Sequence, residues 1–493
     1  MAADLPAAPT AGWPRPEGDT NRTATVLPTL GVVCSVYILL QTAVVPGLPE
    51  IERSLHTSPS TAGWLTSGFL LSAAVSTPVV GRLGDMLGKR RMLLWILGVL
   101  AVGTLLCALA PNVQTLIAGR VIQGVSAGVM PLSFSIIRHS LPARKVPGAL
   151  GILSALLGVG GCLGLVLSAV VVSQLSWQWL FWLTFPMAAA ALAAVLLAVP
   201  DTPTEPSGRF SVLSLLLMSA FLVGLLVAIT EVNRWGATSL TFIGLVAIAV
   251  AFAVLWVFNE LRVRVPLVDV RLMRRRAVLS ANLSGVLLGF GLFGANVLVP
   301  ALAAQPRTGS FGFGYGVIGS GLLLLPSALC SLAICCFVGR LESRFGSRDC
   351  LLVGCLVTAG SYGLLGAWHS APLAVAVSTG FLGIGIGVAY ASMINLVVQS
   401  VPPDNTGVAT GVNAIARTVG GSIGTQLTLT LLTNGTSHPT DHGFAVASYL
   451  TMAMLGVAFL SVLAVPNRAR IVKERLSPEA AEVSRVDSAQ PIA

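Results

Sequence analysis

Residues 81–90 read GRLGDMLGKR and residues 339–348 read GRLESRFGSR, so a glycine, an arginine, a leucine, a second glycine and a final arginine recur 258 positions apart. A second pair of segments repeats at almost the same offset, because GGCLG at residues 160–164 matches GGSIG at residues 420–424, 260 positions later. Offsets that agree this closely indicate an internal duplication. We therefore expect two homologous halves that run in the same direction.

The composition is that of a membrane protein. Of the 493 residues, 55% are hydrophobic and 10% are charged, with a mean hydropathy of +0.86, whereas soluble proteins carry about 25% charged residues. Apolar runs long enough to cross about 30 Å of hydrocarbon as helices recur along the chain, which predicts an all-α polytopic fold. We expect fourteen spans: 26–46, 61–80, 92–110, 114–137, 148–173, 178–199, 211–230, 238–258, 277–303, 317–338, 350–367, 371–397, 406–432 and 443–465.

These spans divide the chain into two six-helix halves separated by two extra helices. Nearly all of the 29 lysines and arginines fall in the tails and in alternate loops, Arg53, Arg234 and Arg307 being the exceptions outside the spans. Because basic loops stay on the cytoplasmic side, both termini are predicted to be cytoplasmic. The net charge of +10 then indicates loops that face anionic lipid rather than nucleic acid. The parts are a disordered tail (1–25), the N-terminal half (26–199), the extra helices with a basic loop (200–276), the C-terminal half (277–465) and a second tail (466–493).

The duplicated glycine segments predict close helix packing. Small residues at four-residue spacing let two helices approach each other closely. Static packing and a moving interface both explain such a seam, and its duplication strengthens the case for a moving one. The candidate hinge residues are Gly160, Gly161, Gly164, Gly420 and Gly424.

The motifs resemble those of the major facilitator superfamily, and specifically its fourteen-helix drug:proton antiporter branch. GRLGDMLGKRR from Gly81 resembles the family's motif in the loop between helices two and three, with Met86 in place of a basic residue. RVIQG from Arg120 resembles the basic motif of helix four, and GVGGCLG at 158–164 occupies the site of the antiporter motif of helix five without its proline. The resemblance implies a secondary transporter that works by alternating access and exports drugs in exchange for protons.

The loop motif supplies the predicted gating residues. A carboxylate such as Asp85 can accept hydrogen bonds from the free amides at a helix N-terminus. By resemblance, this contact closes the cytoplasmic side in one state, and its partner is the start of the helix near Thr406 and Gly407. The alternative is a basic loop that only fixes orientation and holds an incidental acid. The gating residues are Gly81, Arg82, Asp85, Gly88, Lys89 and Arg90.

The proton carrier is displaced or absent. The family's usual candidate is an acid in the first helix, where this chain has Leu40 and Gln41. By the predicted spans, none of the 19 acidic residues lies in the middle of a helix. Glu231, at the outer end of the seventh span, is the candidate carrier, with a solvated loop residue as the alternative. A uniporter, or coupling to another ion, also remains open.

Two arginines, Arg120 and Arg417, are expected inside helices, where a charge is costly and calls for a partner. Arg120 is predicted either to face the cavity near Gln41, where it relays coupling or holds an anionic group, or to be locked to backbone carbonyls or to Gln123. Arg417, whose counterpart in the first half is Leu157, is a further coupling candidate.

The cargo site is expected near the midplane, between the halves. Three residues of the ninth span, Asn282, Phe293 and Asn296, fall on one helical face. Aromatic and amide groups without a fixed carboxylate suggest a bulky amphipathic cargo that is neutral or anionic. The predicted contacts are Tyr37, Gln41, Trp64, Asn282, Phe293, Asn296, Tyr390 and Asn413.

The leading hypothesis is export of drugs or antibiotics across the cytoplasmic membrane, coupled to proton influx. A facilitator or importer of a small metabolite and a non-transporting receptor on the same fold are the alternatives. The sequence contains no GxxxxGK[ST] nucleotide loop and no metal-ligand spacing, so we expect no cofactor, no metal and no enzymatic activity. We expect a monomer whose partners are a small-molecule substrate, protons and membrane lipid, and not nucleic acid.

Overall fold

The computed structural model describes residues 20–44, 47–142, 145–201, 211–236, 238–263, 266–307, 311–402, 405–433 and 439–465. The predicted tail at 466–493 and the first 19 residues of the tail predicted at 1–25 lie outside these ranges. The first helix begins at Thr20, so the last residues of the predicted disordered tail are helical.

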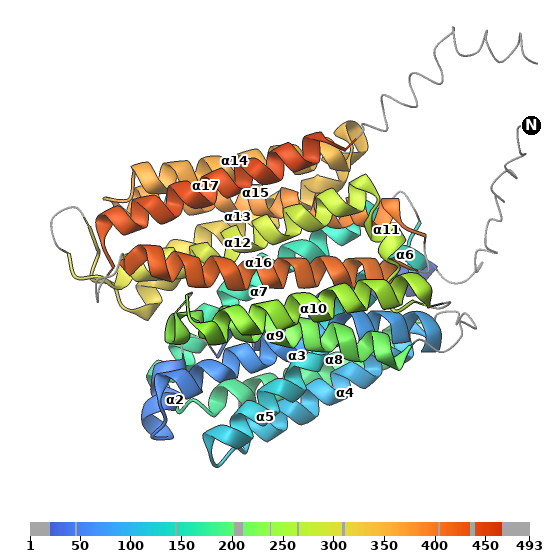
Figure 1. Cartoon of the computed structure of the whole chain (residues 1–493), viewed down its shortest axis with the longest axis horizontal. Coiled ribbons are helices and arrows are strands. Elements are labelled where there is room, and N and C mark those ends of the chain that lie inside the picture. The colour runs from blue at the N-terminus through green and yellow to red at the C-terminus, as the bar shows by residue number, and fades with distance from the viewer. Residues whose placement is uncertain are drawn as a thin grey trace, which may run out of the picture.

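The described elements are all helices (Figure 1). The first part of the chain forms α1 (Thr20–Thr42), α2 (Leu48–Ser54), α3 (Pro59–Leu87), α4 (Lys89–Ala108), α5 (Val113–Gly124), the 3-10 turn η2 (Val125–Gly128), α6 (Val129–Ser140), α7 (Val146–Gln174) and α8 (Trp179–Ala198). The middle forms α9 (Val212–Trp235), α10 (Leu240–Arg262) and α11 (Val270–Met273). The last part forms α12 (Arg276–Ala304), α13 (Val317–Phe345), α14 (Ser347–Ala367), α15 (Pro372–Ser400), α16 (Thr406–Thr433) and α17 (Asp441–Leu463).

The helices are those of a multi-pass membrane protein. Among the described residues, 12 helices are long and apolar enough to cross a membrane. Two more, α7 with 29 residues and α16 with 28, match them in length and carry the duplicated glycine segments. The prediction of an all-α membrane fold is therefore confirmed.

Each half of the sequence repeat has its own hydrophobic core. One cluster of buried residues is built from α1, α3, α4, η2, α6, α7 and α8, together with Ile394 and Val398 of α15. Another is built from α12–α17 and Phe311, in the segment between α12 and α13. The two bodies lie side by side, and α15 contributes to both cores.

The two halves meet at two equivalent helix crossings. Where α3 crosses α16, a Cβ atom added to Gly81 would lie 2.9 Å from the carbonyl oxygen of Gly407. Where α7 crosses α13, a Cβ added to Gly339 would lie 2.8 Å from the Cα of Gly148. The sequence offset of the repeat relates Gly81 to Gly339 and, within one residue, Gly148 to Gly407. The two crossings are therefore copies of one contact, and glycine is needed in both.

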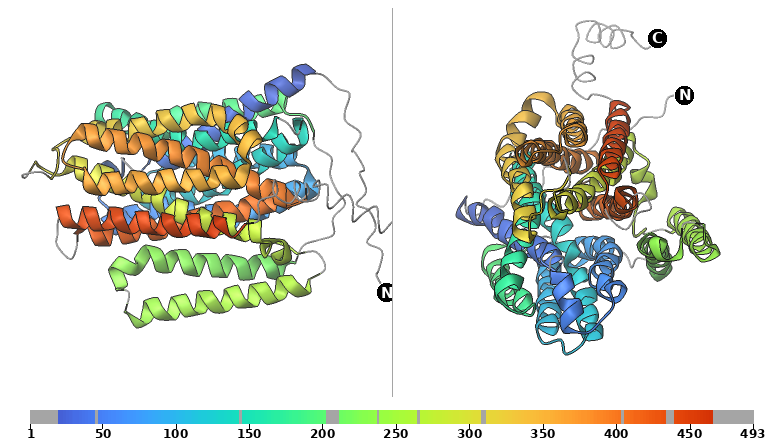
Figure 2. Two further views of the ribbon diagram at one scale, coloured as in Figure 1. Left: turned by 90° about the horizontal axis from the view of Figure 1, so that it is seen from above. Right: turned by 90° about the vertical axis from the view of Figure 1, so that its left-hand side faces the viewer.

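The middle helices form a hairpin at the edge of the bundle (Figure 2). The α9 helix packs against α3 and α16, and α10 packs against α9. Large apolar side chains along α10 are exposed, among them Ile243, Ile248, Val254 and Phe258. In a membrane this face contacts lipid, because exposed apolar surface of this extent is stable only there.

The GRLGDMLGKR segment is not a loop, so its predicted conformation is wrong. The α3 helix continues to Leu87 and α4 begins at Lys89, with Gly88 alone between them at a φ of 97°. Gly346 occupies the same place between α13 and α14, with a φ of 85°. A left-handed glycine reverses the chain within one residue, so both helices extend beyond the predicted apolar spans.

Candidate functional site

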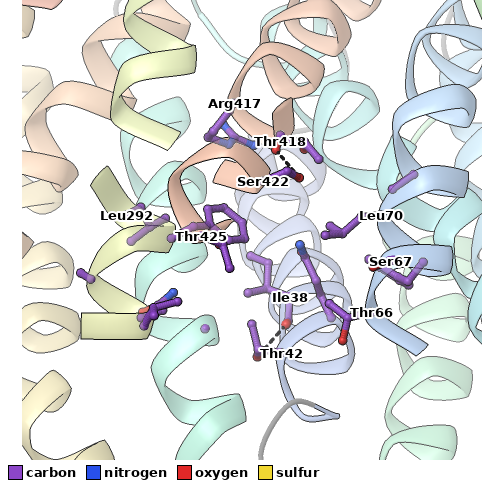
Figure 3. A pocket seen from close by; sticks show the side chains of 18 of the residues that line it. Ile38, Thr42, Thr66, Ser67, Leu70, Leu292, Arg417, Thr418, Ser422 and Thr425 are labelled. Atoms are coloured by element: carbon purple, nitrogen blue, oxygen red, sulfur yellow. Dashed lines mark hydrogen bonds between the residues drawn. The ribbon is translucent and has the colours of Figure 1, made fainter. Parts of the chain in front are cut away.

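A cavity of about 1020 Å³ lies between the two halves (Figure 3). Its walls come mainly from α1, α3, α12, α13, α15 and α16, with contributions from α2, η2, α6, α7 and α9. We call the end of the bundle that carries Gly88 and Thr406 the Gly88 end. Leu48 of α2 and Gly63 line the cavity, so it extends toward the opposite end. Six predicted cargo contacts line it: Tyr37, Gln41, Trp64, Phe293, Asn296 and Tyr390.

Two predicted cargo contacts instead hold helices together. The Nδ2 of Asn413 donates to the Oδ1 of Asn282 and to the carbonyl of Ala281, each at 3.1 Å. Asn413 is 1% exposed, and neither amide lines the cavity. In this structure the two hydrogen bonds of the Asn413 Nδ2 tie α16 to α12.

Arg120 lies behind the cavity wall. It is fully buried, and its guanidinium carbon lies 4.4 Å from the centre of the Phe69 ring. Phe69 in turn stacks on Tyr37, with 6.3 Å between the ring centres. Both aromatic residues line the cavity, whereas Arg120 and Gln123 do not. Of the two predicted positions for Arg120, the locked one is therefore the one observed in this conformation.

The partners of Arg120 are backbone carbonyls and an amide. Its Nε donates to the carbonyl of Leu65 at 3.1 Å, and its Nη1 donates to the carbonyl of Leu40 at 3.1 Å and to the Oε1 of Gln123 at 2.8 Å. The Nε2 of Gln123 continues the network to the Oγ1 of Thr104 at 2.8 Å. One arginine thus ties α5 to α1 and α3, and its neighbour Gln123 extends the connection to α4.

The charged side chains that line the cavity, among the described residues, are Glu231 and Arg417. Glu231 is 9% exposed and lies inside α9, which continues to Trp235. The predicted alternative of a solvated loop residue is therefore wrong. Arg417 lies on α16, along the same wall as Thr418, Ser422 and Thr425 (Figure 3).

The halves are joined tightly at the Gly88 end. Asp85 and Lys89 form a buried ion pair at 3.6 Å. A Cβ added to Gly407, at the start of α16, would lie 3.4 and 3.5 Å from the two carboxylate oxygens of Asp85. The structure therefore brings Asp85 to the helix start that the family resemblance implies.

The other basic residues of the gating set lie elsewhere. Arg90 donates to the carboxylate of Asp201 at 2.7 Å and to the carbonyl of Leu196 at 2.9 Å, so it joins α4 to the end of α8 within the first half. Arg82 is half-buried on α3. The residues of this set at the crossing itself are therefore Gly81, Asp85 and Lys89.

Sequence reasoning missed two contacts between the halves. Arg138 of α6 donates to the carbonyls of Val401 at 3.2 Å and Pro402 at 3.4 Å, and to the hydroxyl of Thr406. Because carbonyl acceptors leave no mark in a sequence, no motif could have found this contact.

The second missed contact lies at the α7–α13 crossing. The Nδ2 of Asn395 donates to the Oε2 of Glu342 at 2.7 Å and to the carbonyl of Pro147 at 3.3 Å. Glu342 is 6% exposed within α13. The repeat aligns Ser343 with Asp85, so a search one residue either side of the aligned position would have found this second carboxylate.

Both glycine seams lie within a half. A Cβ on Gly160 would meet Ile38 at 3.0 Å, and one on Gly164 would overlap Thr42, so this seam packs α7 against α1. A Cβ on Gly424 would meet the carbonyl oxygen of Phe290 at 2.5 Å, so the other seam packs α16 against α12. Gly161 faces the cavity instead. The inter-half crossings use other glycines, so the hinge role of the seams stays a prediction.

Gly420→Ala is expected to destabilise the second half. The added Cβ would overlap the carbonyl oxygen of Val286, a backbone atom that cannot rotate away. Forcing α16 and α12 apart should lower the free energy of unfolding by about 1–3 kcal/mol, seen as a lower melting temperature of the purified protein. Gly360→Ala is the control, because its Cβ would meet nothing within 4 Å. Equal melting temperatures for the two variants would contradict the contact.

Comparisons with known proteins agree with this architecture. A family model described as the Major Facilitator Superfamily matches residues 30–425. The chain is 31% identical over 415 residues to the methylenomycin A resistance protein of Streptomyces coelicolor, covering 83% of this chain and 84% of that protein. It is 28% identical over 393 residues to a multidrug resistance protein B homolog of Mycobacterium tuberculosis, covering 78% and 71%. The crystal structure of the human organic anion transporter MFSD10 (TETRAN) superposes with a TM-score of 0.65 at 16% identity, covering 89% of this chain and 99% of that one.

Proposed function

The chain belongs to the Major Facilitator Superfamily, and from this premise we propose that it exports antibiotics or other bulky amphipathic molecules across the cytoplasmic membrane in exchange for protons. It is a multi-pass membrane transporter and not an enzyme. The observation that carries the proposal is the cavity of about 1020 Å³ between the halves, with aromatic and amide side chains in its wall. The names of the two bacterial relatives, which refer to multidrug and antibiotic resistance, support drugs or antibiotics as the cargo class.

The proposed topology has fourteen spans, with α7 and α16 added to the 12 that meet the apolar criterion. The basic loops support cytoplasmic termini, which makes the Gly88 end the cytoplasmic end. The contacts of Asp85 and Arg138 then seal the cavity from the cytoplasm, and this conformation faces outward. Export proceeds when the halves, 26–199 and 277–465, rock about the cavity, while the extra helices at 200–276 remain attached to the edge. We propose that a single chain is the working unit.

Accumulation in inverted membrane vesicles tests the proposal. Methylenomycin A, the antibiotic in the name of the 31% identical relative, is the first cargo to try, followed by larger amphipathic antibiotics. Exporting vesicles should accumulate cargo when their lumen is made acidic, and dissipating the pH gradient should remove that accumulation. Accumulation that does not depend on the gradient would leave the exporter in place but exclude proton coupling.

Glu231→Gln is expected to uncouple transport from protons. Among the described cavity-lining residues, Glu231 is the one carboxylate, and it is buried in α9 where the cavity can expose it to one side at a time. Glutamine keeps the size of the side chain but cannot carry the proton. Uptake driven by the pH gradient should fall at least about tenfold, while exchange of labelled for unlabelled cargo without a gradient should persist.

Glu50→Gln provides the matched control, because the partly exposed Glu50 side chain pairs with Arg53 at 3.5 Å and does not line the cavity. This variant should retain gradient-driven uptake. Full gradient-driven uptake by Glu231→Gln as well would remove Glu231 from the coupling mechanism.

A further inference from the structure

We propose that Arg417 and Tyr390 form an anion-binding subsite, so that the preferred cargo is an aromatic amphiphile that carries a carboxylate or a similar planar anionic group. This inference rests on the proposed function, because it assigns a cargo class to the same cavity. It gives Arg417 a role in recognition, whereas the sequence pattern made it a candidate for coupling.

The position of Arg417 suits recognition of cargo. It lies about midway along α16 and lines the cavity. Its guanidinium carbon lies 5.2 Å from the centre of the Tyr390 ring, which lines the same wall. The guanidinium is planar, and two of its N–H donors can bind both oxygens of a carboxylate.

The subsite is held in place by its surroundings. Tyr390 is 1% exposed, and its hydroxyl donates to the carbonyl of Leu288 at 3.4 Å. A Cβ added to Gly289 of α12 would overlap the carbonyl oxygen of Arg417, so the two helix backbones are in direct contact at this position. The ring and the backbone of the arginine are therefore both fixed before a ligand arrives, which is how a preorganised binding site is built.

The contrast with Arg120 isolates the role of Arg417. Arg120 is fully buried and is covered by Phe69, and its Nε and Nη1 donate to two carbonyls and an amide oxygen of the protein. Arg417 is half-buried at the cavity, and within the described part of the chain no carboxylate lies within 4.0 Å of its nitrogens. A cation at membrane depth without a protein counter-charge is costly, and an anionic group on the cargo would supply that charge.

The rest of the wall defines the remainder of the cargo. Tyr37, Trp64 and Phe293 add aromatic surfaces to the same cavity, and such surfaces bind flat apolar rings. Among the described residues, Glu231 is the other charged side chain of the wall, and it favours a cationic cargo, which is the competing cargo class. Three probes with one ring system therefore separate the two: 1-pyrenecarboxylate, its neutral amide, and 1-pyrenemethylammonium.

Binding of these probes to purified protein in phosphatidylcholine nanodiscs tests the subsite. Fluorescence titration of the wild type, corrected for empty nanodiscs, should give tighter binding of the carboxylate than of the amide or the ammonium. Arg417→Gln should weaken carboxylate binding at least about tenfold and leave amide binding unchanged. Arg417→Lys should retain part of the preference, since it keeps the charge but not the two-pronged geometry. Arg307→Gln, at an exposed position outside the cavity, is the matched control.

The outcomes separate this inference from the proposed function. Wild-type protein that shows no preference for the carboxylate, or binds none of the probes, would overturn the subsite, as would equal losses of carboxylate and amide binding in Arg417→Gln. Melting temperatures of all variants are measured alongside, and equal losses count against the subsite when the melting temperature of Arg417→Gln is unchanged. If that variant is destabilised, the preference of the wild type and of Arg417→Lys decides. If vesicles transport antibiotics but the purified protein binds the three probes equally, the proposed export is supported and the subsite is not. If the protein prefers the carboxylate probe but vesicles transport no antibiotic, the subsite is supported and the proposed export is not.

Discussion

Arg120→Ala is expected to abolish transport and to lower the free energy of unfolding by about 1–3 kcal/mol for each buried acceptor that it leaves unsatisfied. The substitution leaves the carbonyls of Leu65 and Leu40 and the Oε1 of Gln123 without their donor inside a closed interior. It also removes one of the largest fully buried side chains in the described part of the chain. The junction of α5 with α1 and α3 should loosen, and the Phe69 and Tyr37 rings that line the cavity should lose their support.

Two measurements separate loss of this network from loss of a cargo contact. Arg120→Ala should lower the melting temperature of the purified protein and weaken binding of all three pyrene probes alike. Arg120→Lys should recover only part of the stability, because one ammonium cannot reproduce the geometry of the guanidinium donors. Val121→Ala, which changes the adjacent and 41% exposed residue, should behave like the wild type. A stable Arg120→Ala protein with normal transport would show that the network is dispensable.

Gly81→Val is expected to prevent closure at the Gly88 end and to reduce transport at least about tenfold. The Cβ of the new side chain would lie 2.9 Å from the carbonyl oxygen of Gly407 and 3.3 Å from the nitrogen of Val408, so α3 and α16 could not cross at their present separation. Since both contacts are to backbone, no rotamer change relieves them. The equilibrium should shift toward the state in which this end is open.

The labelling rate of a single introduced cysteine measures that shift. Thr410 is 3% exposed near the start of α16, and in a cysteine-free background Thr410→Cys should react slowly with an impermeant thiol reagent added to inverted vesicles. Adding Gly81→Val should raise the rate several-fold. Gly98→Val is the control, because a Cβ there would meet nothing within 4 Å. An unchanged labelling rate together with normal transport would mean that this crossing does not limit closure.

The sequence predicts the membrane fold because length and hydropathy decide it, and the offset of the repeat predicts two halves that can be matched residue by residue. It fails where polar residues continue a helix. The charges around Asp85 predict a loop and Glu231 is predicted at the outer end of its span, whereas α3 and α9 extend through them. Apolar runs locate the hydrophobic part of a helix but not its full length. Acidic residues in the polar ends of a helix are therefore assigned to loops, even where they are buried.

The site was partly predictable for a related reason. Residue types that bind amphipathic molecules identify most of the cavity wall, but not which amides pair with each other, as Asn282 and Asn413 do. Backbone carbonyls and Gln123 are among the predicted partners of Arg120, but the sequence does not say which carbonyls, because every residue carries one; the structure shows those of Leu65 and Leu40. The types of side chain can be read from the sequence, whereas the tertiary packing decides which backbone carbonyls accept their hydrogen bonds.

The peripheral hairpin of α9 and α10 bears on how such a transporter arises. Both hydrophobic cores form without it, so excising residues 212–262 should leave two intact halves and most of the cavity. The excision would remove Glu231, the cavity's carboxylate in the described part of the chain. On the proposed mechanism, a duplicated twelve-helix ancestor gains its proton-coupling residue from an inserted segment. Proton coupling and the cargo pocket can then be inherited, exchanged or lost independently.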